Sequence, residues 1–224
     1  MKTDDELQQD VIAELSWDPQ LIDVHAQLGV AAKNGVITLS GLVDSCNKKI
    51  AAEKAAQRVK GVRVVASDVE VKLGVLGAKS DGEIAEAVRS ALVWNSAVNQ
   101  DMIQIKVDNG WVYLDGEVEW AFQRASVEHG IEDLSSVKGI TNNIRIKEKR
   151  VDAIALKTQI SSAFQRNAAV DANSIKVETS GTNVTLCGTV KSWSEKKEAE
   201  RVAWSSPGVT SVDNQIGIDV EVYA

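Results

Sequence analysis

The sequence is poor in aromatic residues, proline and cysteine, and it has no long apolar run. Among its 224 residues, Phe, Tyr and Trp make up 4%, and there are two prolines and two cysteines. No apolar stretch reaches the ~18 residues that a membrane-spanning helix needs, so no transmembrane segment is expected. The scarcity of proline and the regular apolar pattern exclude a disordered chain and indicate a soluble globular protein.

The N-terminal stretch MKTDDELQQDVIAEL also lacks the features of a secretory signal. Such a signal has a basic start and then an unbroken apolar stretch, whereas this stretch is acidic and amphipathic. We therefore expect a cytoplasmic protein as the sequence is written, or a periplasmic one if a leader has been removed.

The chain offers few residues for catalysis or metal binding. Cys46 and Cys187 stand at unrelated positions, and His25 and His129 have no metal-ligand spacing around them. We find no paired carboxylates, no Ser/His/Asp or Cys/His arrangement, no P-loop and no GxGxxG. The acidic cluster Asp4-Asp5-Glu6 is explained by the dipole of a helix start. The sequence therefore predicts no catalytic residues, no metal and no cofactor.

The charge balance excludes a second class of function. The net charge is −7, and none of the segments described below is basic. Binding to nucleic acid or to anionic lipid through release of counterions lacks its usual driving force. No nucleic-acid partner is expected.

One phrase occurs three times, as NGVITLSGLV at 34–43, NGWVYLDGEV at 109–118 and GTNVTLCGTV at 181–190. Before each phrase, apolar residues four apart mark one face of a helix, and they are followed by an alternating strand. The helix positions are Leu7, Val11 and Leu15, then Ile84, Val88 and Leu92, then Leu156, Ile160 and Phe164. A second helix and a final strand follow each phrase.

The predicted fold is therefore α+β, with three tandem α-β-β-α-β units, each a three-stranded mixed sheet with two helices on one face. We place the units at 4–73, 80–149 and 152–220, joined by linkers at 74–79 and 149–151. S/T-x-x-E capping boxes start helices at Thr3, Ser80 and Ser192. The units either pack together or follow one another as separate domains, and the oligomeric state stays open.

Several local features follow from this alignment. Asn34-Gly35 and Asn109-Gly110 predict tight hairpin turns, and Ser180-Gly181 predicts one shifted by a residue. Gly130 falls on the apolar face of a second helix, where it is expected to let the helix approach the sheet closely.

The repeated units resemble BON domains, a bacterial family with a v-x-L-x-G-x-V phrase and a P-G-V-x-x-V-x-N-x-I close. The phrase is present at 37–43, 112–118 and 184–190, and the close is best at 207–216. The second unit departs, with Ser136 where the glycine should be and Asn143 before Ile144. The resemblance implies backbone-shape roles for the following glycines: Gly41, Gly61, Gly116, Gly188 and Gly208.

The resemblance also implies a non-catalytic module that interacts with phospholipid in osmotic or envelope stress. The alternative is a protein-interaction or self-assembly module that uses the sheet face left open by the helices in the second unit. A KH-like nucleic-acid binder is a third class, but the GxxG loop of that fold is missing.

Tryptophan supplies the candidate contact residues, because an indole suits a membrane interface or a partner surface. Trp111 and Tyr113 point to the open sheet face and occur only in the second unit, while Trp120 and Trp193 lie near second-helix starts. We take these four residues as candidates for lipid or partner contact. A neighbouring unit covering Trp111 is the alternative.

The remaining tryptophans are assigned to packing. Trp17 and Trp94 occupy equivalent positions at the ends of first helices, so we interpret them as packing residues. Trp204 is expected to be partly buried.

Overall fold

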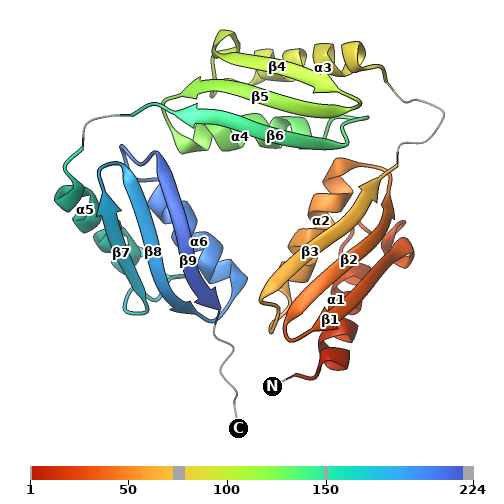
Figure 1. The fold of residues 1–224 in the computed structure, drawn as a ribbon, viewed down its shortest axis with the longest axis horizontal. Helices are drawn as coiled ribbons and strands as arrows, with labels where there is room; N and C mark the ends of the chain where they lie inside the picture. The colour runs from red at the N-terminus through yellow and green to blue at the C-terminus, as the bar shows by residue number, and fades with distance from the viewer. Residues whose placement is uncertain (1, 73–78, 149–150, 219–224) are drawn as a thin grey trace. The chain divides into compact units, whose positions relative to one another are not determined.

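The computed structural model describes residues 2–72, 79–148 and 151–218. These three segments share one order of elements, helix-strand-strand-helix-strand, as the sequence predicted (Figure 1). The predicted domain ends at 73, 149 and 220, and the linker residues 74–78 and 149–150, lie outside the described residues.

The first unit contains α1 (Asp4–Trp17), the short 3₁₀ helix η1 (His25–Gln27), β1 (Leu28–Lys33), β2 (Val36–Val43), α2 (Cys46–Arg58) and β3 (Val64–Val71). The second contains α3 (Asp81–Trp94), η2 (Gln100–Met102), β4 (Ile103–Asp108), β5 (Trp111–Val118), α4 (Ala121–Glu132) and β6 (Gly139–Ile146). The third contains α5 (Ala153–Arg166), β7 (Ile175–Ser180), β8 (Asn183–Val190), α6 (Trp193–Trp204) and β9 (Ser211–Ile218).

Each unit folds its strands into a three-stranded sheet with the second strand in the middle. In the first and third units the hairpin strands are antiparallel, and the last strand lies parallel to the central one after the crossover through the second helix. Both helices of a unit lie on the same face of its sheet, and the other face is free of helices (Figure 1). The predicted α+β class and the mixed sheets are confirmed.

The core of each unit lies between the sheet and its two helices. The predicted first-helix trios are all buried, and so are the inward-facing residues of the central strands: Ile37, Leu39, Val43, Val112, Leu114, Val118, Val184, Leu186 and Val190. Small residues line the second helix of the first unit, where Ala52, Ala55 and Ala56 are fully buried. The two periodicities of the sequence thus predict the buried faces correctly.

The central-strand glycines share one geometry. Gly41, Gly116 and Gly188 have positive φ angles of 121°, 153° and 130°. A Cβ on these residues would lie 2.2, 2.2 and 2.1 Å from the carbonyl oxygens of Gln27, Met102 and Ser174, just before the first strand of each unit. Only glycine therefore allows the central strand to approach the chain that enters the sheet.

A second set of positive φ angles lies after the second helix. Gly61 and Gly208 have φ of 107° and 88°. Ser136 stands at the equivalent position of the second unit and adopts φ of 73°, although it carries a side chain. Its hydroxyl accepts a hydrogen bond from the backbone N–H of Lys79 over 3.1 Å. The backbone shape is therefore kept where the glycine is replaced.

Two turn and helix predictions need correction. The turn of the third unit is Gly181-Thr182, in the same register as the other two, because β7 extends through Ser180 and Gly181 supplies the positive φ of 59°. Gly130 does not approach the sheet: it is exposed, and a Cβ there would have no atom within 4 Å. The residues of this helix that face the core are Val127 and Ile131, and both are buried.

The capping boxes are confirmed at Thr3 with Glu6 and at Ser80 with Glu83. Ser192 also caps its helix, but the Glu195 carboxylate accepts hydrogen bonds from the backbone N–H groups of Lys191 and Asp171. This carboxylate therefore ties the loop after the first helix to the second helix, in place of closing the box.

The asparagine of the closing motif is also reassigned. In the second unit Asn142, and not Asn143, matches Asn214 of the third. Asn142 donates from Nδ2 to Oε2 of Glu128 over 3.0 Å, and its Oδ1 accepts from the backbone N–H of Ile144. Asn143 lies on the other, exposed face of the strand.

Candidate functional site

The most exposed aromatic side chains among the described residues are Trp17 and Trp94. Each is the last residue of a 14-residue first helix, and their exposed fractions are 82% and 87%. Val93 beside Trp94 is also exposed. The packing role predicted for these two tryptophans is wrong, because both rings project from the unit to which they belong.

The reason lies in the helix geometry. Leu15 and Leu92 are the last buried residues of α1 and α3, and each tryptophan follows two positions later. At 3.6 residues per turn, a step of two residues turns the side chain about 200° away from the core. This spacing was visible in the sequence and could have identified both residues.

Polar contacts hold these helix ends in place. In the first unit Asp18, directly after Trp17, accepts a hydrogen bond from Arg58 Nη2 over 2.7 Å, and Arg58 Nε donates to Glu14 over 2.8 Å. The Arg58 guanidinium lowers the pKa of Asp18 below its ordinary value. The carboxylate therefore stays ionised and keeps the end of α1 fixed against the end of α2.

The second and third units use an asparagine at the same place. Asn95 donates from Nδ2 to Oγ of Ser126 over 3.1 Å, and Asn167 donates to Oε1 of Glu198 over 2.6 Å. In the third unit the helix ends with the exposed Arg166 where the others have tryptophan. A polar contact between the residue after the first helix and the second helix is thus common to all three units, while the exposed indole belongs to the first two.

Trp111 lies on the open face of the second sheet and is partly covered by its own strands. The six-membered part of its ring lies over Gly139, where a Cβ would be only 2.5 Å from the ring atom Cη2. Its Nε1 donates to Oγ1 of Thr141 over 2.8 Å, and 39% of the side chain stays exposed. Gly139 therefore makes the space that the indole occupies.

The other sequence-predicted contact residues are half-buried. The Tyr113 ring has the ammonium of Lys106 5.4 Å from its centroid, an arrangement suited to a cation–π contact. Trp120 and Trp193 are also of intermediate exposure, and Lys196 Nζ lies 5.5 Å from the centroid of the Trp193 ring. Trp204 is partly buried against the core of the third unit, as predicted. Of the four candidates, Trp111, Tyr113 and Trp120 belong to the second unit and Trp193 to the third.

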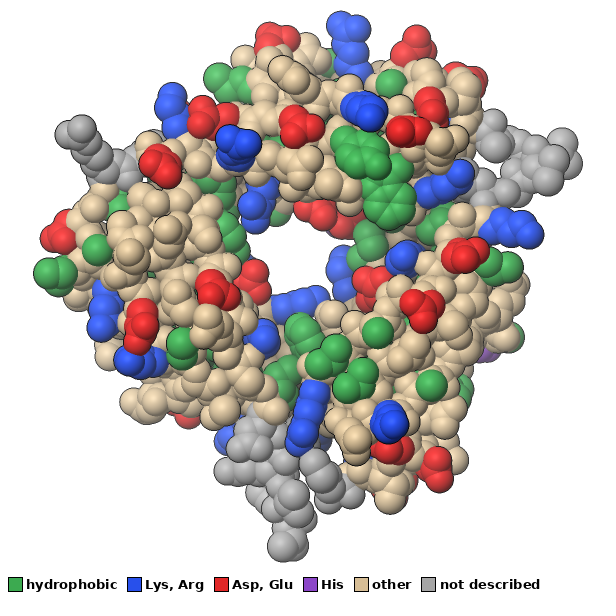
Figure 2. Space-filling view, viewed as in Figure 1, with side chains coloured by type: hydrophobic (Ala, Val, Ile, Leu, Met, Phe, Trp, Pro, Cys, Tyr) green, Lys and Arg blue, Asp and Glu red, His purple; other side chains and the backbone are tan. Residues whose placement is uncertain are grey.

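The open sheet faces differ between units. Figure 2 looks onto these faces and shows hydrophobic side chains on the first and second units, while uncharged polar side chains and backbone dominate over β7–β9. The aromatic pair Trp111 and Tyr113 occurs on the second unit, and Val36 and Thr38 stand at these positions on the first. The scaffold therefore repeats while its outer surface does not.

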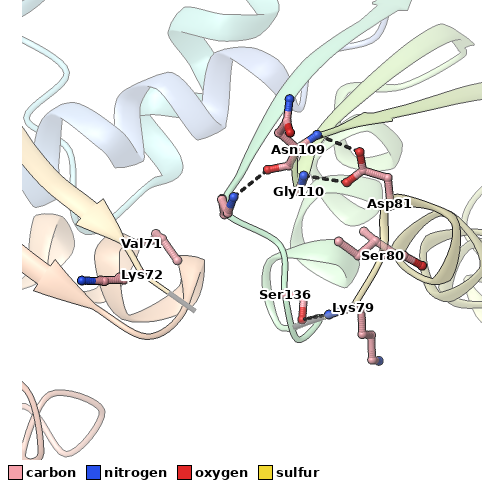
Figure 3. A pocket seen from close by; sticks show the side chains of 10 residues that line it. Val71, Lys72, Lys79, Ser80, Asp81, Asn109, Gly110 and Ser136 are labelled. Atoms are coloured by element: carbon pink, nitrogen blue, oxygen red, sulfur yellow. Dashed lines mark hydrogen bonds between the residues drawn. The ribbon is translucent and has the colours of Figure 1, made fainter. Parts of the chain in front are cut away.

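A carboxylate clamp orders one end of the second unit. Asp81, the first residue of α3, accepts 2.8 Å hydrogen bonds from the backbone N–H groups of both Asn109 and Gly110 (Figure 3). Lys138 Nζ donates to the Asn109 carbonyl oxygen over 2.8 Å. Asp4 makes the corresponding contact with Asn34 in the first unit. These groups satisfy each other and stabilise the hairpin turn.

The described residues hold neither a metal cluster nor a spanning helix. Within residues 2–72, 79–148 and 151–218, no three His, Cys, Asp or Glu side chains are arranged to hold a metal ion. No helix in these segments has the length and apolarity needed to cross a bilayer. Both cysteines are free thiols.

Comparison with known proteins places these repeats in a family. The sequence profile of the BON domain matches residues 3–72, 80–148 and 153–219, most of the chain. The "Osmotically-inducible protein Y" of Escherichia coli (strain K12) is 32% identical over 143 residues, which cover 61% of this chain and 71% of that protein. The "21 kDa hemolysin" of Actinobacillus pleuropneumoniae is 28% identical over 148 residues, covering 65% and 74%.

One solved structure that aligns with most of this chain is CdsD, a structural protein of the type III secretion system of Chlamydia trachomatis. It is 13% identical, covers 94% of this chain and 91% of its own, and has a TM-score of 0.27. A score this low carries no information about function.

Proposed function

The chain belongs to the BON-domain family, and from this premise we propose that it is a non-catalytic protein that binds phospholipid surfaces in the response to osmotic or envelope stress. The osmotic context rests on the name of the Escherichia coli relative, which describes that protein as osmotically inducible. The observation that carries the lipid contact is the exposure of Trp17 and Trp94 at equivalent helix ends.

An exposed indole is the side chain best suited to the boundary between headgroups and acyl chains. A tryptophan buries ~150–250 Å² when it is fully covered. At ~25 cal/mol per Å² this amounts to about 4 kcal/mol at the low end of that range, and partial insertion gives a part of it. Once one of the two indoles of a chain has bound a vesicle, the other is held near the same surface at a raised effective concentration. Two contacts therefore give a higher affinity for the vesicle than one.

The charge pattern defines how the contact works. The last turns of α1 and α3 contain no basic residue, and the chain carries a net charge of −7. Attraction to anionic headgroups therefore contributes little. The proposal is an insertion contact that works on zwitterionic vesicles and depends only weakly on salt.

Liposome co-sedimentation of the full chain tests this proposal. Vesicles of phosphatidylcholine, with and without added phosphatidylglycerol, are titrated with wild type, Trp17→Ala, Trp94→Ala and the double variant. We expect each single change to weaken binding about tenfold, equivalent to about 1.4 kcal/mol, and the double change to abolish it. Arg166→Trp, which places an indole at the third helix end, is expected to strengthen binding.

Trp111→Ala is the matched control, because it also removes one indole, but from a sheet position where the ring is partly covered and 39% exposed. If only Trp111→Ala lost vesicle binding, the lipid contact would lie on the open face of the second sheet, at Trp111 and the neighbouring Tyr113, as the sequence predicted. Absence of binding by the wild type to both kinds of vesicle would overturn the lipid proposal. The alternative, a protein partner on the open face of the second unit, would then be preferred.

A further inference from the structure

Exposed apolar side chains of the second unit gather at one end of it. Asp81, the first residue of α3, binds the hairpin turn, so the last turn of this helix lies at the end of the unit away from that turn. Ile103 pairs with Gly116 in the register of β4 and β5, so the chain just before β4 lies at the same end. We call this end the far end of the second unit.

The far end carries four of the five large apolar side chains that are exposed in the described part of this unit, and each of the four is at least 55% exposed. They come from the last turn of α3, from the residue before β4, and from the first turn of α4, which begins just after β5 ends. The four are Val93, Trp94, Met102 and Phe122. The fifth, Trp111, lies on the open sheet face. The large exposed apolar side chains of the unit are therefore concentrated at one end.

The fold does not require apolar residues at these four positions. The third unit has the same strand order, and its helices and strands have the same lengths. Its equivalent positions hold polar residues, namely Gln165, Arg166, Ser174 and Ser194. In its described part the one exposed large apolar side chain is Ile154, at the start of α5. The apolar far end is therefore a property of the surface of the second unit, and exposed apolar residues gathered in this way mark a contact site.

The charged groups closest in sequence to these apolar residues are acidic. The segments 93–102 and 119–123 contain no lysine or arginine, whereas Asp101 and Glu119 are both exposed. The nearest bases along the chain are Arg89 and Arg124. Electrostatic attraction to anionic headgroups therefore contributes little at the far end, and its affinity for a bilayer comes from the burial of apolar side chains.

A bulky apolar side chain enters a bilayer where gaps between the headgroups expose the acyl chains. A contact that depends on such insertion, with little attraction to headgroups, is sensitive to curvature and lipid packing. Side chains that project from helix ends and a loop also suit a fluid partner, because lipids rearrange around each of them. On the basis of the lipid contact proposed above, we propose that the far end of the second unit senses loosely packed lipid. It inserts Trp94, Met102 and Phe122 into gaps that curvature or osmotic stretching opens.

Flotation of the full chain with phosphatidylcholine vesicles tests the proposal, with binding expressed per accessible lipid of the outer leaflet. Small, highly curved vesicles, large vesicles, and large vesicles swollen in a dilute medium are made from the same unsaturated lipid. We expect the wild type to bind the small and the swollen vesicles about tenfold more tightly than the large ones. Headgroup charge is the same in all three, so the difference measures lipid packing.

Two variants identify the surface. Met102→Ser and Phe122→Ser each introduce the residue that the third unit carries at the equivalent position, so both are compatible with the fold. Each should weaken binding to small vesicles about tenfold and reduce the difference between small and large vesicles. Ile154→Ser is the matched control, because it also removes an exposed apolar side chain, but from the start of α5 in the third unit. This control should bind like the wild type, and thermal unfolding of all three variants should match that of the wild type.

The outcomes separate this proposal from the lipid contact on which it rests. Equal binding of the wild type to all three kinds of vesicle would overturn the sensing of lipid packing and leave the lipid contact in place. Binding of the Met102→Ser and Phe122→Ser variants at the level of Ile154→Ser would exclude the far end as the sensing surface. Absence of wild-type binding to every vesicle would overturn both proposals.

Discussion

Asn214 on β9 donates a hydrogen bond from Nδ2 to Oε2 of Glu200 on α6 over a distance of 3.0 Å. Its Nδ2 also lies 3.3 Å from the Lys196 carbonyl oxygen, and its Oδ1 accepts from the backbone N–H of Ile216. One side chain thus ties the last strand to the second helix. This explains in physical terms why the closing motif carries an asparagine.

Asn214→Ala should destabilise the third unit by about 1–3 kcal/mol, because it leaves half-buried polar groups without their partners. Native-state hydrogen exchange of the amides in β9 and α6 measures this loss unit by unit. Gln215→Ala is the control, since Gln215 is exposed and its side-chain contacts with Asp213 and with Cys187 Sγ do not involve α6. Equal protection in both variants would contradict the role of the tie.

The first unit provides the reverse experiment. Ser67 occupies the equivalent position on β3, and its Oγ is buried with no hydrogen-bond partner in the described part of the chain. Glu53 stands where the other units have Glu128 and Glu200. Ser67→Asn should therefore create the missing tie and stabilise the first unit by about 1 kcal/mol.

Hydrogen exchange of β3 again provides the measurement, in a double-mutant cycle with Glu53→Ala. The gain should disappear when Glu53 is absent. A gain that persists in the Glu53→Ala background would show that removal of the unpaired hydroxyl, and not a new hydrogen bond, is responsible.

Ser136 should show an inverted preference between glycine and alanine. Alanine keeps the left-handed backbone, which costs a residue with a side chain about 1–2 kcal/mol, and it also loses the hydrogen bond from Lys79. Glycine loses the same hydrogen bond but relieves the strain. The free energy of unfolding of the second unit should therefore be higher for Ser136→Gly than for Ser136→Ala, and the opposite order would contradict the strained assignment.

Gly130 and Gly116 should respond in opposite directions to alanine. Gly130 is helical and exposed with open space around it, so alanine should stabilise the second unit by about 0.5–1 kcal/mol. At Gly116 a methyl group would overlap the Met102 carbonyl oxygen, so alanine should destabilise the unit by about 3 kcal/mol or more. Thermal and urea unfolding of both variants measure the difference.

The local periodicities were enough to predict the repeated fold. Spacings of four gave the buried trio Leu156, Ile160 and Phe164, and alternation gave Val184, Leu186 and Val190, because both are properties of short segments. The exposure of Trp94 was also contained in the helical spacing. Equivalence between two repeats does not by itself indicate packing, because Trp17 and Trp94 are equivalent and both are exposed.

Other features depend on pairing between distant segments. That Trp111 lies over Gly139 follows from the placement of β6 beside β5, which no local pattern specifies. The assignment of Asn143 in place of Asn142 has the same origin, since a shift of one residue along a strand moves a side chain to the other face. The sequence supplied the candidates, and only the register determined which of them face the helices.

Glu198 should make the stability of the third unit depend on pH in the acid range. The hydrogen bonds from Arg201 and Asn167 lower the pKa of this carboxyl from its ordinary 4.5 to about 2. A carboxyl whose folded pKa is lowered stabilises the fold above its unfolded pKa, and this contribution is lost as the pH falls from about 4.5 to about 2. Arg201→Ala should raise the pKa of Glu198 toward its ordinary value, and Glu198→Gln should flatten the pH dependence in this range. NMR titration of the Glu198 carboxyl, with urea unfolding of the third unit at each pH, measures both effects; a midpoint unchanged by Arg201→Ala would assign the shift to Asn167.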